Sequence, residues 1–149
     1  MMRYTKYIDR IFCRMFKSCV VCKQIKRVIN MILSIQLNRI TGKAVRKTLS
    51  ALEGKSPEIY FHDFYGAVDV SPRNLVIWYI FKTDSDLSHA KDSGFCNEIE
   101  NLTAGNLIAC GYPESSFDAD ENGRKVSVCF ASQEDVDRKA DGDYRLYFQ

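Results

Sequence analysis

Three of the chain's six cysteines lie near its N-terminus, and two of them, Cys19 and Cys22, have the Cys-x-x-Cys spacing of zinc ligands and redox pairs. A structural zinc site usually combines two such pairs, or one pair with nearby histidines. Here there is one pair, and both histidines, His62 and His89, lie far along the chain. Because the two cysteines also fall on the apolar side of a predicted helix, we interpret them as small hydrophobic residues and predict no metal ligands.

The segment DADENG, residues 118–123, matches the first half of a calcium-binding loop. Asp118, Asp120 and Asn122 stand at the alternating positions where such a loop places its oxygen ligands. The bidentate glutamate required at the end of the loop is replaced by Cys129, and two basic residues follow the segment directly. We therefore predict a solvated turn, and cation binding stays open as an alternative.

The two histidines are the remaining candidates for acid–base chemistry. His62 and Asp63 are neighbours on a predicted strand, so their side chains point to opposite faces and cannot pair. His89 lies near the acidic start of a predicted helix, and the sequence contains none of the common motifs of nucleotide-binding proteins or hydrolases. We predict no catalytic residue and no cofactor, and a cryptic hydrolytic or metal-dependent enzyme is kept as an alternative.

The elements that must position these residues begin with a basic amphipathic helical arm, predicted for residues 1–40. A break at Thr41–Gly42 separates the arm from an α+β domain at 41–149. Within the arm, residues spaced alternately four and three positions apart are mostly apolar, and this spacing places them on one side of a helix. The uncharged run at 28–38 is too short to cross a bilayer, so no transmembrane segment is expected. The cations between the apolar positions form a predicted basic surface of Arg10, Arg14, Lys17, Lys23 and Arg27.

A second helix is predicted at 43–54, and beyond it the period of the apolar residues changes from that of a helix to that of a strand. Alternating and continuously apolar segments predict a hairpin of two strands, at 58–67 and 75–81. Capping residues and glycines then indicate helices between 83 and 110, followed by a strand at 125–131, a short helix and a closing strand at 143–149. The predicted fold is α+β, in α-β-β-α-β-β order, with a four-stranded, mostly antiparallel sheet and its helices gathered on one face.

Charge is unevenly divided along the chain. Residues 1–52 contain twelve Lys or Arg and one acid, whereas residues 53–149 contain nine Lys or Arg and eighteen Asp or Glu. The basic part indicates peripheral binding to nucleic acid or to an anionic membrane through residues 1–30 as one hypothesis. Met31 is a second position at which translation of the chain would start naturally. Six cysteines without a repeating spacing indicate reduced thiols and a cytoplasmic location.

The acidic part of the chain carries aromatic residues that favour a different hypothesis. Tyr60, His62 and Phe64 alternate onto one face of a predicted strand, and with Trp78 they would form an open platform if the helices cover the other face. An acidic surface with aromatic anchors suits a protein partner of basic or mixed charge. Our first prediction is therefore a small non-enzymatic binding protein that docks its partner on this platform.

Overall fold

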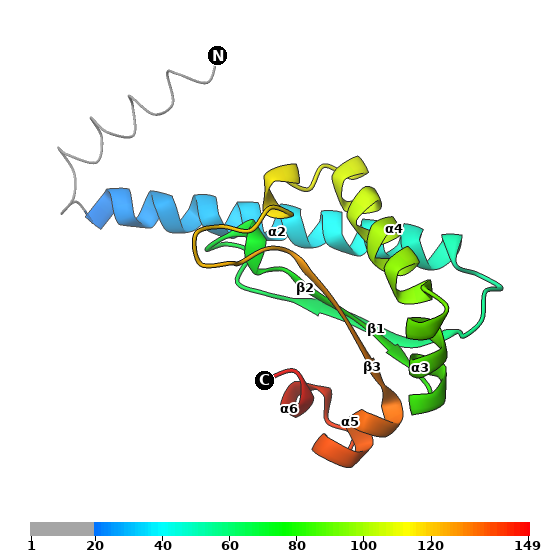
Figure 1. The fold of residues 1–149 in the computed structure, drawn as a ribbon. Coiled ribbons are helices and arrows are strands. Elements are labelled where there is room, and N and C mark those ends of the chain that lie inside the picture. Colours follow the sequence, from blue (N-terminus) through cyan, green and yellow to red (C-terminus); the bar gives the residue numbers. More distant parts are fainter. Residues whose placement is uncertain (1–19) are drawn as a thin grey trace.

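The computed structural model describes residues 20–149, which form an α+β fold around a three-stranded mixed sheet. In chain order, the elements are α2 (Val20–Ala51), β1 (Ile59–Tyr65), the 3-10 helix η1 (Pro72–Asn74), β2 (Val76–Phe81), α3 (Asp84–Asp92), α4 (Phe95–Ala109), the 3-10 helix η2 (Glu114–Ser116), β3 (Ser127–Ser132), α5 (Gln133–Ala140) and α6 (Tyr144–Tyr147). The central strand β2 pairs antiparallel with β1 and parallel with β3. Helices α2 and α4 lie on one face of the sheet, and α5 and α6 lie toward the other (Figure 1).

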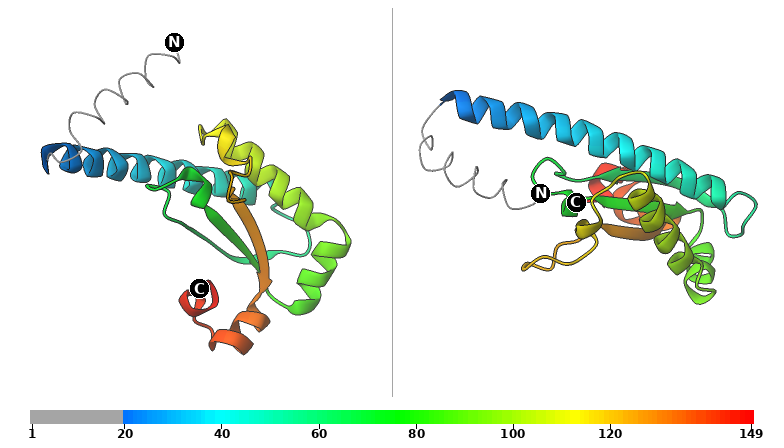
Figure 2. Two further views of the ribbon diagram at one scale, coloured as in Figure 1. Left: turned by 60° about the vertical axis from the view of Figure 1, so that its left-hand side comes forward. Right: turned by 90° about the horizontal axis from the view of Figure 1, so that it is seen from above.

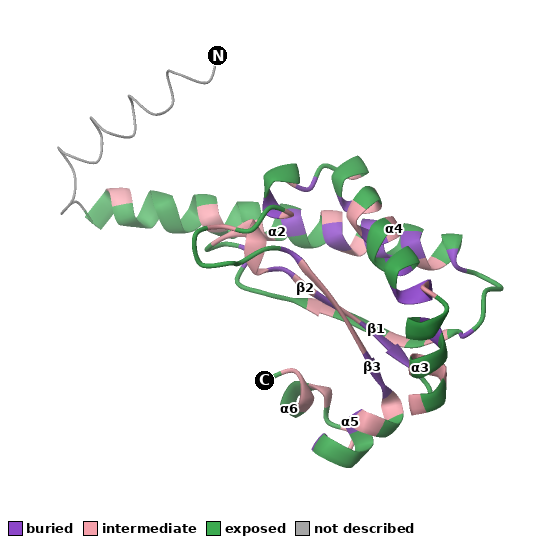
Figure 3. Cartoon of the chain, viewed as in Figure 1, coloured by how far each residue is buried: buried purple, intermediate pink, exposed green. Residues whose placement is uncertain are grey.

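The core lies between the sheet and the layer formed by α2 and α4. On β2, Ile77, Tyr79 and Phe81 point toward this layer and are fully buried, as the two-residue period of a strand requires. Val45 of α2 belongs to the same cluster, and the buried hydroxyl of Tyr79 lies 2.9 Å from that of Thr103 on α4. Figure 3 shows the buried residues concentrated along this inner side of the helices and the strands. The strand predicted at 75–81 is confirmed as β2.

Strands β2 and β3 run side by side, and each leads directly into a capped helix. At the start of α3, the Thr83 hydroxyl accepts a hydrogen bond from the Asp86 N–H (3.0 Å), and at the start of α5 the Ser132 hydroxyl accepts one from the Asp135 N–H (3.0 Å). The Ser132 hydroxyl also donates to the Asp84 carboxylate, which ties the two helix starts together. The capped helices predicted after these strands are confirmed.

Two parts of the predicted fold are wrong. The segment predicted as a closing strand contains helix α6, whose start is capped by the Asp143 side chain accepting the Arg145 N–H at 2.8 Å. The sheet described by residues 20–149 therefore has three strands, and the β2–β3 pair is parallel. The helices are also not gathered on one face, because Tyr144 and Tyr147 of α6 pack against Phe61 and Trp78 on the face of the sheet away from α2 and α4.

The predicted helix break at Thr41–Gly42 is absent, because α2 continues through both residues. The Thr41 hydroxyl donates to the carbonyl oxygen of Leu37 one turn earlier (2.8 Å), and Leu37 and Val45 on either side of the glycine are buried. This packing offsets the roughly 1 kcal/mol that a glycine costs inside a helix. The predicted boundary between residues 40 and 41 thus falls within one continuous helix, and residues 1–19 of the predicted arm lie outside the described residues.

Candidate functional site

Helix α2 extends past the body of the protein at its N-terminal end. Its 32 residues give a rod about 48 Å long, and its N-terminal half lies beyond the sheet in the views of Figure 2. The first buried residue in α2 is Leu37. The segment 20–35 therefore adds no buried side chain to the core, although it is rich in large aliphatic residues.

One side of α2 carries its buried residues in the second half of the helix, and we call the full line of residues on this side the inner row. Alternating steps of four and three residues keep these side chains on one side of a helix. The second half of the row is buried against the sheet and α4, whereas the first half is polar. The inner row consists of Lys23, Arg27, Asn30, Ser34, Leu37, Thr41, Ala44 and Thr48.

The opposite side of α2 points away from the body, and we call it the outer row. Here the order of polar and apolar residues is reversed, because aliphatic residues come first and cations follow. The five aliphatic side chains are between 46% and 62% exposed, and the three cations are exposed as well. A helix that packs on a core normally turns its aliphatic side inward. The exposed aliphatic residues of the outer row therefore indicate an interaction surface. The outer row consists of Val21, Ile25, Val28, Ile32, Ile35, Arg39, Lys43 and Arg46.

Charge on α2 has one sign. The helix contains seven Lys or Arg residues and no Asp or Glu. Among residues 20–149, the salt bridges involve body residues and leave all seven of these cations without an ion-pair partner. Two members of the predicted basic surface, Lys23 and Arg27, are exposed on α2. The other three, Arg10, Arg14 and Lys17, lie outside the described residues.

The residues of the predicted aromatic platform do not share one face of the sheet. In the β1–β2 register, Phe64 lies opposite Ile77 and packs against the core, whereas Trp78 lies opposite Asp63 on the other face. His62 belongs to the same face as Phe64, and it lines a small hollow at the end of α2. Tyr60 is exposed at a bulge in β1. Phe64 pairs with Ile77, and Trp78 is the next residue after Ile77 on β2. Because successive side chains of a strand point to opposite faces, Trp78 and Phe64 lie on different faces.

Trp78 instead belongs to an aromatic cluster with residues of the C-terminus. Its ring stacks on Phe148 with centroids 4.9 Å apart, and its Nε1–H donates to the Tyr65 hydroxyl at 3.2 Å. The Tyr65 hydroxyl in turn donates to the Phe148 carbonyl oxygen at 3.0 Å. The C-terminal aromatic cluster thus fastens α6 over this face of the sheet, and it consists of Phe61, Tyr65, Trp78, Tyr144, Tyr147 and Phe148.

A charged network on α5 holds the same helix in place. The Asp135 carboxylate accepts hydrogen bonds from Lys139 (2.8 Å), Tyr147 (2.5 Å) and Arg138 (2.7 Å). These donors, with Lys139 first, hold the pKa of Asp135 well below its usual range. Burial, together with the neighbouring carboxylate, raises the pKa of Tyr147 to about 12. Every group has a structural partner, so we assign this network to stability rather than to chemistry.

The residues with possible catalytic or metal-binding chemistry do not converge. His62 and His89 line two separate hollows, both of which include Lys55. In the DADENG segment, the Asp120 carboxylate accepts the N–H groups of Asn122 and Arg124, both at 2.9 Å, and pairs with the Arg124 guanidinium. These bonds, the one from the Arg124 N–H foremost, lower the pKa of Asp120. Within residues 20–149, no group of three or more potential metal ligands lies close enough to hold an ion.

Sequence reasoning missed the outer row, although its signal is present in the chain. The predicted apolar stripe used other positions of the same helix. It therefore did not identify the outer row, with its aliphatic residues at 21–35 and its cations at 39–46. Among residues 20–149, no helix has the length and apolar character needed to cross a membrane. No protein-family model matches the sequence, and comparison with curated proteins and with solved structures finds no match.

Proposed function

We propose that the protein binds peripherally to anionic membrane surfaces through the outer row of α2. The observation that carries this proposal is the line of five exposed aliphatic side chains followed on the same side by three exposed cations. In an interfacial helix the aliphatic side enters the acyl boundary while cations of the opposite, polar side meet the anionic headgroups, and Lys23 and Arg27 lie on that side here. The interruption of α2 by Lys23, Lys26 and Arg27 favours lying along the interface rather than crossing it.

The energy available from this surface is sufficient for reversible binding. Full burial of an isoleucine or valine side chain contributes roughly 1.5–3 kcal/mol, and these side chains are already about half covered. Each of the five therefore offers about 1 kcal/mol. A Lys or Arg near an anionic membrane surface adds roughly 1 kcal/mol. The cost of association offsets part of this total, so binding should be moderate and should weaken as salt is added.

The other partners considered for the chain receive less support. Nucleic acid is bound through phosphates, for which cations suffice, and five exposed aliphatic side chains would add little. Docking of a protein on the acidic body relied on a common face for Phe64 and Trp78, and the β1–β2 register places them on opposite faces. Parallel pairing of two α2 outer rows would bring like charges together around Arg39, Lys43 and Arg46.

Vesicle co-sedimentation of the full chain tests the proposal. The vesicles contain phosphatidylcholine alone or with phosphatidylglycerol, and the partition coefficient is measured at low and high salt. The double variant Ile25→Ser/Ile32→Ser removes two apolar contacts worth about 2 kcal/mol together, so its partition coefficient should fall roughly 30-fold. Both side chains are exposed, and circular dichroism should show an unchanged fold.

The matched control is Ile108→Ser/Leu146→Ser, which removes two exposed aliphatic side chains from the body. It should bind the vesicles as the unaltered chain does. Equal binding by Ile25→Ser/Ile32→Ser and the unaltered chain would refute the role of the outer row. A chain that binds duplex DNA or forms a stable dimer, and has no affinity for the anionic vesicles, would refute the proposal as a whole.

A further inference from the structure

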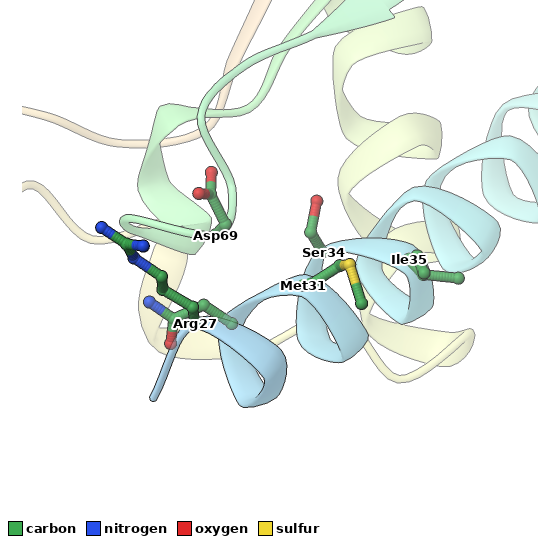
Figure 4. Close-up of a pocket in the computed structure, with 6 residues that line it drawn as sticks. Arg27, Met31, Ser34, Ile35 and Asp69 are labelled. Carbon is green, nitrogen blue, oxygen red and sulfur yellow. The ribbon is translucent and has the colours of Figure 1, made fainter. Parts of the chain in front are cut away.

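A hollow of about 430 Å³ lies between the first half of α2 and the loop that follows β1 (Figure 4). The hollow is largely open to solvent, so it would cover only part of a ligand. One wall is formed by α2 and the other by the loop residue Asp69. The lining residues are Arg27, Asn30, Met31, Ser34, Ile35 and Asp69.

The lining combines three kinds of chemistry. Arg27, Asn30 and Ser34 belong to the inner row and offer hydrogen-bond donors to an anion. Asp69 supplies a negative charge on the opposite wall, and among residues 20–149 neither it nor Arg27 takes part in a salt bridge. Met31 and Ile35 are apolar, and Ile35 is also the last aliphatic residue of the outer row. Ile35 thus lies at the edge of the hollow nearest the outer row, the surface proposed to enter the membrane.

We propose that this hollow binds the headgroup of an amine-bearing phospholipid of the phosphatidylethanolamine class. The phosphate lies toward the Arg27 guanidinium, whose planar donors suit a phosphate, and the ammonium lies toward the Asp69 carboxylate. The lipid chains continue past Ile35 into the bilayer. A ligand with negative charge alone would be repelled by Asp69, so the carboxylate favours a zwitterion. This inference depends on the proposed function, because the bilayer supplies the lipid.

The ammonium group accounts for the selectivity that the site should have. An ethanolamine ammonium has three N–H donors for a carboxylate, whereas the trimethylammonium of choline has none. Asp69 should therefore distinguish the two headgroups although both are zwitterions. Replacing phosphatidylcholine by phosphatidylethanolamine at constant phosphatidylglycerol should tighten binding of the full chain about three- to fivefold, as expected for an exposed charged hydrogen bond.

The experiment measures the ratio of the two partition coefficients, so that each variant is compared with itself. Asp69→Asn should reduce this ratio to about one, because the variant keeps the shape of the side chain and loses its charge. Asp118→Asn is the control, since it changes the net charge equally at another exposed loop position. This control should retain the three- to fivefold ratio. General effects of phosphatidylethanolamine on lipid packing would appear equally in both variants.

The outcomes separate this inference from the proposed function. A ratio of one for the unaltered chain, or an undiminished ratio in Asp69→Asn, would overturn the headgroup site while leaving binding to phosphatidylglycerol in place. Soluble phosphoethanolamine that competes as strongly as the lipid would overturn the assignment to a membrane lipid. Failure of the unaltered chain to bind any anionic vesicle would instead remove the proposed function, and this inference with it.

Discussion

The docking of α6 on the sheet can be tested at Phe148, which stacks on Trp78 and lies within 6 Å of the ring centroids of Tyr65, Tyr144 and Tyr147. Replacing a fully buried phenylalanine by alanine costs about 3–5 kcal/mol. Because Phe148 is half-buried, Phe148→Ala should cost about 2 kcal/mol of the free energy of unfolding. For a chain of this size, that loss lowers the melting temperature by roughly 4–8 °C.

The assay uses Trp78, the single tryptophan of the chain, as a built-in reporter. Urea unfolding is followed by tryptophan fluorescence and by circular dichroism for the unaltered chain, Phe148→Ala and Phe148→Leu. In the alanine variant the native emission should shift to longer wavelength, because water reaches the indole ring. Phe148→Leu keeps an apolar contact and loses the ring stacking, so it should cost about 1 kcal/mol. An unchanged emission and midpoint in Phe148→Ala would refute the docking of α6 on Trp78.

Two further predictions concern stability. Gly66→Ala should lower the free energy of unfolding by about 3 kcal/mol or more, because the backbone has φ 145° and the added Cβ would lie 2.0 Å from the Asn74 carbonyl oxygen. Gly105→Ala, where the added Cβ lies in open space on α4, should raise it by about 0.5–1 kcal/mol. Thermal melts of both variants check this pair. Because the pKa of Asp135 is lowered in the folded protein, its carboxylate contributes to the free energy of unfolding above pH 3.8, the pKa in the unfolded chain. This contribution is lost as the pH falls below that value. Asp135→Asn should therefore show a shallower loss of stability on acidification, measured by urea midpoints at several pH values, and an acid limb as steep as that of the unaltered chain would contradict the assignment.

The sequence was sufficient for those features that depend on near neighbours in the chain. The continuously apolar run at 75–81 is formed by consecutive residues, and the Thr83 and Ser132 caps act within three residues of their own positions. The sequence thus predicted the hairpin and the helices that follow β2 and β3. Closing residues 143–149 were predicted as a strand because their aromatic residues also suit a sheet.

The sequence could not determine which residues would meet across long separations. Trp78 and Phe148 are seventy positions apart, and their stacking decides that the C-terminal segment folds as a helix over the sheet. The parallel pairing of β2 with β3 likewise depends on the intervening α3–α4 connection. Such contacts form because they are compatible with the packing of the whole structure, and no local sequence pattern predicts them.

Helix α2 shows both contributions in one element. Its sequence alone determines that the segment has seven cations and no acids, and that its large aliphatic residues are concentrated in the first half. Only the tertiary structure decides where burial along α2 begins: Leu37 is its first buried residue, and the large aliphatic residues before it remain exposed. The physical reason is that burial requires a partner surface, and the length of the strands, rather than the helix, sets where that surface ends.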